Sequence, residues 1–128
     1  MVTKYGGQAN KNLGDAYLLV WKFPDPQQLK SREPIDTIRF SPENRAMADM
    51  SVFSFLKVLA RINKYQHIRK YRKHAGLKSA IPNYRVKMGF GLHQGWAIEG
   101  AIGSYFKIDA SYLSPNVNMA SRLEMATM

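Results

Sequence analysis

Cysteine is absent from this chain of 128 residues. Its absence excludes a disulfide framework, a cysteine-ligated zinc site and a thiol nucleophile. Long apolar runs are missing too: no stretch approaches the ~20 residues that a membrane-spanning helix needs, and the first residues lack the basic-then-apolar order of a secretory signal. The lack of cysteine does not by itself fix the compartment, but it is compatible with the cytoplasm. We expect a chain that works in the cytoplasm or at the cytoplasmic face of a membrane.

Acidic residues are scarce in one part of the chain. The sequence has 19 Lys and Arg against nine Asp and Glu, and no acidic residue lies between Asp49 and Glu99. Ten basic residues lie in that interval: Lys57, Arg61, Lys64, Arg69, Lys70, Arg72, Lys73, Lys78, Arg85 and Lys87. This single segment carries the whole excess of +10, which makes contact with a nucleic acid or an anionic membrane a hypothesis. It shows neither an RNP-type nor a helix-turn-helix signature, so we expect no nucleic-acid partner.

The length and composition are those of one globular domain. Apolar residues make up 45% of the chain and charged residues 22%, which is the ordinary range for folded proteins. A chain of this length suffices for one compact domain and is too short for two. We therefore expect a single core over residues 1–128.

The first part of the chain predicts a hairpin and a loop. Residues 16–23, AYLLVWKF, form a dense apolar run of strand length, and residues 12–15 before them have turn chemistry. Residues 24–41 are rich in proline and charge, which predicts a surface loop. We expect a hairpin that enters a buried strand, followed by this loop.

A long basic amphipathic helix is predicted over residues 42–73. Ser41-Pro42-Glu43 has the order of a helix start, with a serine cap, proline at the first helical position and an acid in the first turn. Apolar residues then recur at helical spacing until the pattern fades after Tyr65. They are Ala48, Val52, Phe55, Leu56, Leu59 and Ile62.

The last third of the chain predicts a loop, two strands and a helix. Gly76 and Pro82 bracket the loop, and apolar residues alternate with others over 86–92, as in a half-buried strand. A second strand follows, in which three glycines predict tight turns: Gly95, Gly100 and Gly103.

Ser114-Pro115 repeats the cap-then-proline signal of a helix start. On the helix that follows, Val117, Ala120 and Leu123 form an apolar stripe. Asn118 and Arg122 share another face, because residues four apart are neighbours on a helix.

Two stretches together resemble the class III adenylate and guanylate cyclase catalytic domain. The first is NKNLGDAYLLVWKF at residues 10–23, and the second is MGFGLHQGWAIEGAIGSYFKIDASYLSPNVNMASRLEMAT at residues 88–127. They cover roughly half the chain and omit the predicted loop and basic helix. The resemblance implies an α+β, ferredoxin-like nucleotide cyclase fold, incomplete at both ends of this chain. It also implies a partner, a second cyclase domain in a homodimer or pseudo-dimer, with active sites at the interface.

The reaction implied by the resemblance is an intramolecular cyclisation of ATP. The ribose 3′-oxygen attacks the α-phosphorus and pyrophosphate leaves, which yields cyclic AMP. Two divalent metal ions, Mg or Mn, reduce the cost of the developing charge. Asp15, in LGDAY, matches one of the family's two metal-binding aspartates. The alternative for this residue is a turn aspartate, since Asp is a common turn former.

Four further residues match family positions. Lys11 matches the purine-reading position, and an ammonium, which can only donate, suits the acceptor N1 of adenine. Ser111 matches the second purine position, where a hydroxyl can accept or donate. Asn118 and Arg122 match the pair that orients the ribose and neutralises phosphate charge. The structural alternatives are a solvated lysine, a loop hydroxyl and the polar side of an amphipathic helix.

Several family features have no counterpart in the sequence. The resemblance places the other metal-binding aspartate before residue 1 and a phosphate-binding lysine after residue 128. We therefore expect an excerpt of a longer dimeric cyclase, with negligible turnover from these residues alone. The alternative is a catalytically inactive cyclase-like module for nucleotide binding or assembly. For His93, in LHQG, we expect a strand-end role and no metal contact.

Overall fold

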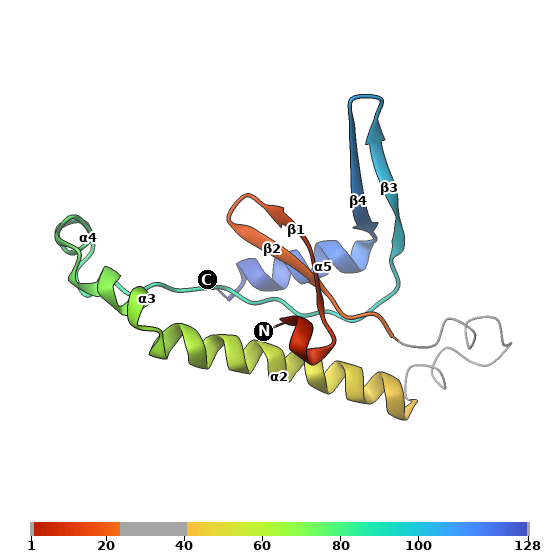
Figure 1. Ribbon diagram of the computed structural model, residues 1–128. Helices are drawn as coiled ribbons and strands as arrows, with labels where there is room; N and C mark the ends of the chain where they lie inside the picture. The colour runs from red at the N-terminus through yellow and green to blue at the C-terminus, as the bar shows by residue number, and fades with distance from the viewer. Residues whose placement is uncertain (1, 24–40, 128) are drawn as a thin grey trace, which may run out of the picture. The chain divides into compact units, whose positions relative to one another are not determined.

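The computed structural model describes residues 2–23 and 41–127 (Figure 1). The chain divides into two compact units, Met1–Lys57 and Val58–Met128, and each is described by itself. Helices occur together with small antiparallel sheets, so the α+β class is confirmed.

The two sheets have two strands each. Strand β1 (Gln8–Leu13) pairs with β2 (Ala16–Val20), and β3 (Ile98–Ser104) pairs with β4 (Lys107–Leu113). Within the described residues no larger sheet forms. The ferredoxin-like arrangement therefore remains a prediction, while the two hairpins are observed.

In the first unit, the predicted hairpin is confirmed. Leu13 pairs with Ala16, so the loop contains only Gly14 and Asp15. Gly14 has a φ of 68°, which a residue without Cβ adopts at little cost. A positive φ at the first loop residue alone is the geometry of a type II′ turn, which matches the twist of antiparallel strands.

The long helix α2 (Pro42–Lys64) begins where the serine-proline signal predicts. The Asn44 backbone N–H donates to Ser41 Oγ at 3.3 Å, so a side chain satisfies one of the free donors at the helix start. Of the predicted loop at 24–41, only Ser41 belongs to the described residues.

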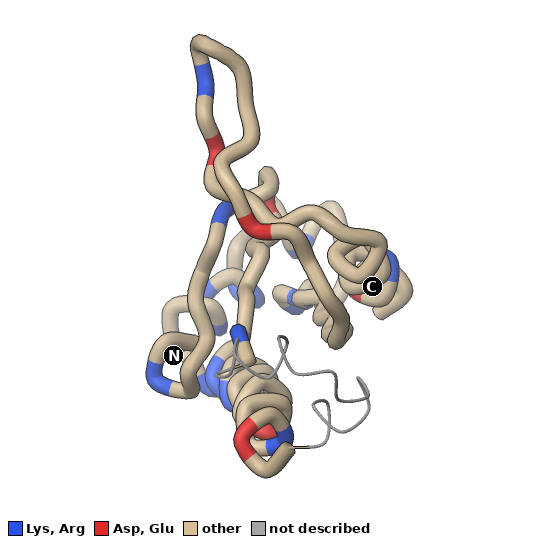
Figure 2. The backbone as a smooth tube through the Cα atoms, turned by 90° about the vertical axis from the view of Figure 1, so that its right-hand side faces the viewer, with Lys and Arg blue, Asp and Glu red and all other residues tan. Residues whose placement is uncertain are grey.

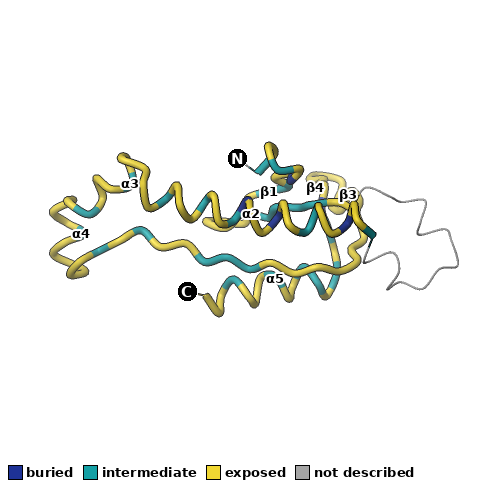
Figure 3. The backbone as a smooth tube through the Cα atoms, turned by 90° about the horizontal axis from the view of Figure 1, so that it is seen from below, coloured by how far each residue is buried: buried dark blue, intermediate teal, exposed yellow. Residues whose placement is uncertain are grey.

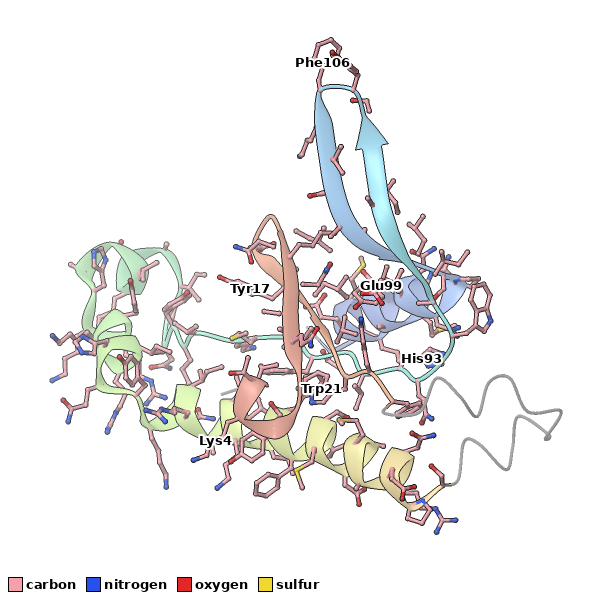
Figure 4. The ribbon with its side chains drawn as sticks, turned by 45° about the vertical axis from the view of Figure 1, so that its right-hand side comes forward. Lys4, Tyr17, Trp21, His93, Glu99 and Phe106 are labelled. Carbon is pink, nitrogen blue, oxygen red and sulfur yellow. The ribbon has the colours of Figure 1, made fainter. Side chains whose placement is uncertain are left out.

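Aromatic contacts hold the middle of α2 to the rest of the first unit. The ring of Tyr5, at the end of the short 3-10 helix η1 (Val2–Tyr5), lies edge-on to Phe53 with centroids 5.3 Å apart. Trp21, one residue beyond β2, packs edge-on to Phe55 at 5.8 Å. Its indole N–H donates to the Tyr5 carbonyl at 3.0 Å. Figure 4 labels Trp21. Edge-to-face packing of this kind stabilises beyond the area that it buries.

The faces of α2 are not arranged as the apolar pattern predicts. The fully buried residues of this helix are polar: Asn44, Ser51 and Ser54. Val52 and Leu56, on the predicted core stripe, are 48% and 57% exposed. Figure 3 shows buried, intermediate and exposed positions alternating along α2. Helical spacing tells which residues share a face, but contacts with distant residues decide which face is buried.

The predicted helix over 42–73 is interrupted. Helix α2 ends at Lys64, and Tyr65 adopts an extended conformation with φ −72° and ψ 120°. A five-residue helix α3 (Gln66–Lys70) and a 3-10 turn η3 (Tyr71–Lys73) follow. The break lies where the apolar pattern fades. Beyond it, no regular apolar stripe is left that could hold a longer helix against a neighbouring element.

Two predictions for the middle of the chain are wrong. Residues 76–82, expected as a loop, include most of the short helix α4 (Ala75–Ala80). Residues 86–92, expected as a strand, have no regular secondary structure. Alternation of apolar residues favours a strand, but a strand also requires a neighbour to accept its backbone hydrogen bonds.

Helix α5 (Pro115–Met125) confirms the second cap-then-proline signal. Ser114 has an extended backbone, and its Oγ accepts from the N–H groups of Asn116 at 3.1 Å and Val117 at 3.2 Å. Such a cap stabilises a helix by about 1 kcal/mol. The start of α5 is therefore fixed by its own sequence.

No helix among residues 2–23 and 41–127 combines the length and the apolar character that crossing a bilayer would take.

Trp21 provides a test of the packing in the first unit. We predict that Trp21→Ala lowers the free energy of unfolding by about 2 kcal/mol, because it removes the Phe55 contact and the hydrogen bond to Tyr5. Tyr17→Ala is the matched control, since Tyr17 lies on the same hairpin and is 62% exposed. Urea unfolding followed by circular dichroism measures both, and equal losses would contradict the assigned packing.

Candidate functional site

The first group of predicted site residues lies on the β1–β2 hairpin. Asp15 is exposed in the two-residue loop, next to Gly14. A Cβ added at Gly14 would meet nothing within 4 Å, so the loop is open on that side. Lys11 lies on β1 opposite Leu18 and is half-buried. The hairpin thus carries both a carboxylate and an ammonium.

An exposed carboxylate of this kind can serve as one ligand of a divalent metal. Magnesium is usually bound by one or two carboxylates together with substrate phosphates and water, and does not need an all-protein cage. Across residues 2–23 and 41–127, no three His, Cys, Asp or Glu side chains come together. Asp15 therefore fits a metal that is shared with a phosphate ligand, and no closed metal cage is found in that part of the chain.

The second group lies on β4 and α5. Ser111, on β4 opposite Gly100, is only 6% exposed. Asn118 and Arg122 are both exposed on α5. They stand four residues apart, so one helical turn brings them to the same side. The helix that carries them has the Ser114 cap at its beginning.

A glycine-containing segment lies along α5 and holds it in place. The Phe90 N–H donates to Thr127 Oγ1 at 3.0 Å, so the segment begins beside the end of α5. A Cβ on Gly91 would overlap the backbone of Ala120 and Glu124. We name residues 90–96 the strap, because backbone packs directly on helix backbone there.

The other end of the strap is fixed by Asn116, in the first turn of α5. Its Nδ2 donates to the Trp96 carbonyl at 2.9 Å, and its Oδ1 lies 3.1 Å from His93 Nε2. A Cβ on Gly95 would overlap the Asn116 side chain. His93 therefore contacts Asn116, which lies on α5 two residues before Asn118. Figure 4 labels His93 on the strap.

The tight turns predicted at Gly95, Gly100 and Gly103 are not observed. Gly95 was expected to form a tight turn, as were Gly100 and Gly103, yet none of the three has a positive φ. Gly100 and Gly103 lie inside β3. Gly91 and Gly95 instead permit close approach to α5. Residues an even number apart lie on the same side of an extended chain, so the spacing of four was the signal that could have indicated this contact.

Two residues beside Ser111 were not predicted. Tyr112, the next residue on β4, donates its hydroxyl hydrogen to Glu99 Oε1 at 3.0 Å, across the pair that Glu99 and Tyr112 form in the sheet. This bond links the beginning of β3 to the end of β4. Opposite polar residues in one cross-strand pair stabilise a hairpin modestly.

The predicted residues thus form two groups. Lys11 and Asp15 belong to the first unit, and Ser111, Asn118 and Arg122 belong to the second. Within each unit the members share one hairpin or one strand–helix connection. Comparison of this chain with protein-family models, curated proteins and solved structures finds no match.

The close approach of the strap to α5 can be tested with glycine variants. We predict that Gly91→Ala lowers stability in the second unit by about 2 kcal/mol, since the added methyl group meets backbone that cannot rotate away. Gly100→Ala is the matched control, because its Cβ would meet nothing within 4 Å. Hydrogen exchange of α5 amides measures the effect. Unchanged protection in Gly91→Ala would refute the packing of the strap.

Proposed function

We propose that this chain is a class III nucleotide cyclase catalytic domain, which converts ATP to cyclic AMP and pyrophosphate as part of a longer dimeric parent. The observation that carries the proposal is that one chain contains both an exposed aspartate in a Gly-Asp hairpin loop and an Asn-x-x-x-Arg pair on a capped helix. Each lies in a stretch of sequence that resembles the family. The two features require different local structures, so they support the proposal independently.

The reaction needs positive charge around the phosphates. When bound, two divalent metal ions, Mg or Mn, supply that charge and stabilise the 3′-alkoxide. Asp15 would hold one of them, and its exposed position leaves room for a phosphate oxygen in the same coordination sphere. For this role Asp15 needs to contribute only one carboxylate oxygen.

The α5 pair would act on the rest of the nucleotide. Arg122 carries a guanidinium whose planar fork suits phosphate oxygens, and Asn118 can accept from and donate to ribose hydroxyls. Both are exposed to an incoming ligand. Their helix is fixed by the Ser114 cap and the strap, so their positions are set before the nucleotide arrives, which lowers the entropic cost of orienting it.

Purine choice would rest on Lys11 and Ser111. The Lys11 ammonium donates to adenine N1, whereas guanine N1 carries a hydrogen and repels a donor. The Ser111 hydroxyl can accept from the adenine amino group. Ser111 is nearly buried, so a ligand reaches it only where a purine edge enters beside β4. ATP is therefore the proposed substrate.

A second cyclase domain, in a homodimer or pseudo-dimer, would complete the site. Supporting this, the described residues include no fully buried hydrophobic side chain. Between β3 and β4, Tyr105 and Phe106 are 95% and 93% exposed. Figure 4 labels Phe106 at the tip of this hairpin. Apolar surface of this kind on a folded chain is typical of an interaction site.

A catalytically inactive cyclase-like module, kept for nucleotide binding or assembly, is the second candidate. The observation that favours it is the isolation of Asp15, since no cluster of three metal-ligating side chains occurs in the described part of the chain. The two candidates differ in turnover and not in binding. A module of this kind would bind ATP without forming cyclic AMP.

The role of Asp15 is tested by its isosteric amide. We predict that Asp15→Asn, made in a longer protein that contains this chain, lowers cyclic AMP formation at least ~10²-fold, because a metal ligand that stabilises transition-state charge is lost. Asp49→Asn removes the same charge from an exposed position on α2 and is the matched control. Equal activity of the Asp15 and Asp49 variants would refute the assignment, and ATP binding without turnover in the unmodified protein would favour the inactive module.

The choice between ATP and GTP is tested by substituting both residues that we propose to contact the purine, Lys11 and Ser111. We predict that Lys11→Glu with Ser111→Cys shifts preference from ATP toward GTP, because glutamate accepts from guanine N1–H where lysine cannot. Cysteine is close to serine in size, so the buried position tolerates it. Lys4→Glu with Ser104→Cys makes the same chemical changes elsewhere. An active Lys11/Ser111 variant with undiminished ATP preference would show that these positions do not read the base.

A further inference from the structure

The strongest charged surface of this chain belongs to none of the site residues discussed above. Residues 64–81 contain α3, η3 and α4, and they hold six basic residues and no acidic one. We name this segment the basic patch. Its cations are Lys64, Arg69, Lys70, Arg72, Lys73 and Lys78. All except the half-buried Arg72 are exposed, and Figure 3 shows α3 and α4 coloured mostly as exposed.

Large apolar side chains are interspersed among these cations. Tyr65, Tyr71 and Ile81 are 47%, 53% and 52% exposed. In the turn of helix formed by α3 and η3, Ile68 and Tyr71 stand three residues apart and are neighbours. Arg69 and Lys73, four residues apart, are neighbours by the same rule. The patch therefore combines apolar side chains with positive charge within two helical turns.

We propose that the basic patch binds the surface of an anionic lipid membrane. Long Lys and Arg side chains can extend their charged ends to lipid phosphates while their methylene stems cover apolar surface. Tyrosine is favoured at the level of the lipid headgroups, where its ring is apolar and its hydroxyl is hydrated. Clusters of four to eight Lys or Arg on a helical segment are typical of binding to anionic lipids.

The same charge could contact a nucleic acid, but the local structure favours a membrane. A helix that reads the major groove lies along it with several turns, whereas α3 has five residues and α4 has six. Single-stranded nucleic acid is bound by aromatic rings on which successive bases stack. One of the two candidate rings here, Tyr65, is already packed against His67, with centroids 5.2 Å apart.

The charges within the patch are all of one sign. No acidic residue lies between Asp49 and Glu99 in the sequence, so none belongs to the patch. Figure 2 colours Lys and Arg blue and Asp and Glu red along the backbone. Attraction to a charged membrane falls off within about 10 Å at ~0.1 M salt. The contact is therefore expected to be peripheral, salt-sensitive and dependent on anionic lipid. It does not depend on the proposed cyclase chemistry, because no residue of the catalytic groups takes part.

Co-sedimentation with lipid vesicles tests the proposal. The 128-residue chain is mixed with vesicles of phosphatidylcholine alone or with added phosphatidylserine, at ~0.05 M and ~0.5 M salt. We expect binding to the anionic vesicles at low salt, at least tenfold weaker binding at high salt as charges are screened, and none to neutral vesicles. Equal binding to both kinds of vesicle would overturn the proposal.

Matched double variants locate the contact. Lys70→Gln with Lys73→Gln should weaken binding about 25-fold, at about fivefold for each cation near the surface. Lys4→Gln with Lys107→Gln removes the same charge from exposed positions elsewhere and should stay within about twofold of the unmodified chain. Equal losses in the two double variants would mean that net charge, and not this patch, attracts the membrane. Tyr71→Ser should weaken binding at both salt concentrations.

A competition experiment separates lipid from nucleic acid. A single-stranded RNA of mixed sequence is added to the vesicle-bound chain at equal phosphate concentration. We expect the chain to stay on the vesicles, because a membrane also accommodates the aliphatic side chains of Ile68 and Ile81, on which bases do not stack. Release of the chain into a complex with RNA would overturn the membrane proposal and assign the patch to nucleic acid.

Discussion

The described residues of this chain do not close a hydrophobic core, and each unit depends on a few close contacts in its place. No large apolar side chain among them is fully buried. In the first unit, edge-on aromatic pairs hold α2 to η1 and to the end of β2. In the second, Gly91 lets the strap approach the backbone of α5. Contacts of this kind have little redundancy, so a single added methyl group or lost ring affects a whole unit.

This constraint also determines how the candidate site residues are held. Asp15 depends on a two-residue turn that Gly14 makes possible, and its position follows from the hairpin alone. Asn118 and Arg122 depend on α5, which is fixed by its Ser114 cap and by the strap. Polar residues thus lie on locally determined elements while much apolar surface stays exposed. A partner domain would cover such surface and bring further side chains to the same nucleotide.

Local signals in the sequence predicted the elements that local interactions determine. The turn at Gly14 and Asp15 and the helix starts at Ser41 and Ser114 all follow from capping and backbone preferences of neighbouring residues. Residues 86–92 alternate as a strand does but lack a neighbouring strand. Small polar residues of α2 are buried where an apolar stripe was expected. A strand needs a neighbour that can be distant in sequence, and no local pattern records whether that neighbour is present.

The central claim is that Asp15 binds a metal ion together with the phosphates of a nucleotide. Paramagnetic broadening by Mn²⁺ tests it directly, because the ion broadens amide signals only near the place where it binds. In the ¹⁵N-labelled chain with ATP, the account predicts broadening centred on Gly14 and Asp15 that disappears in Asp15→Asn. Broadening that is unchanged in that variant, or centred on other residues, would contradict it.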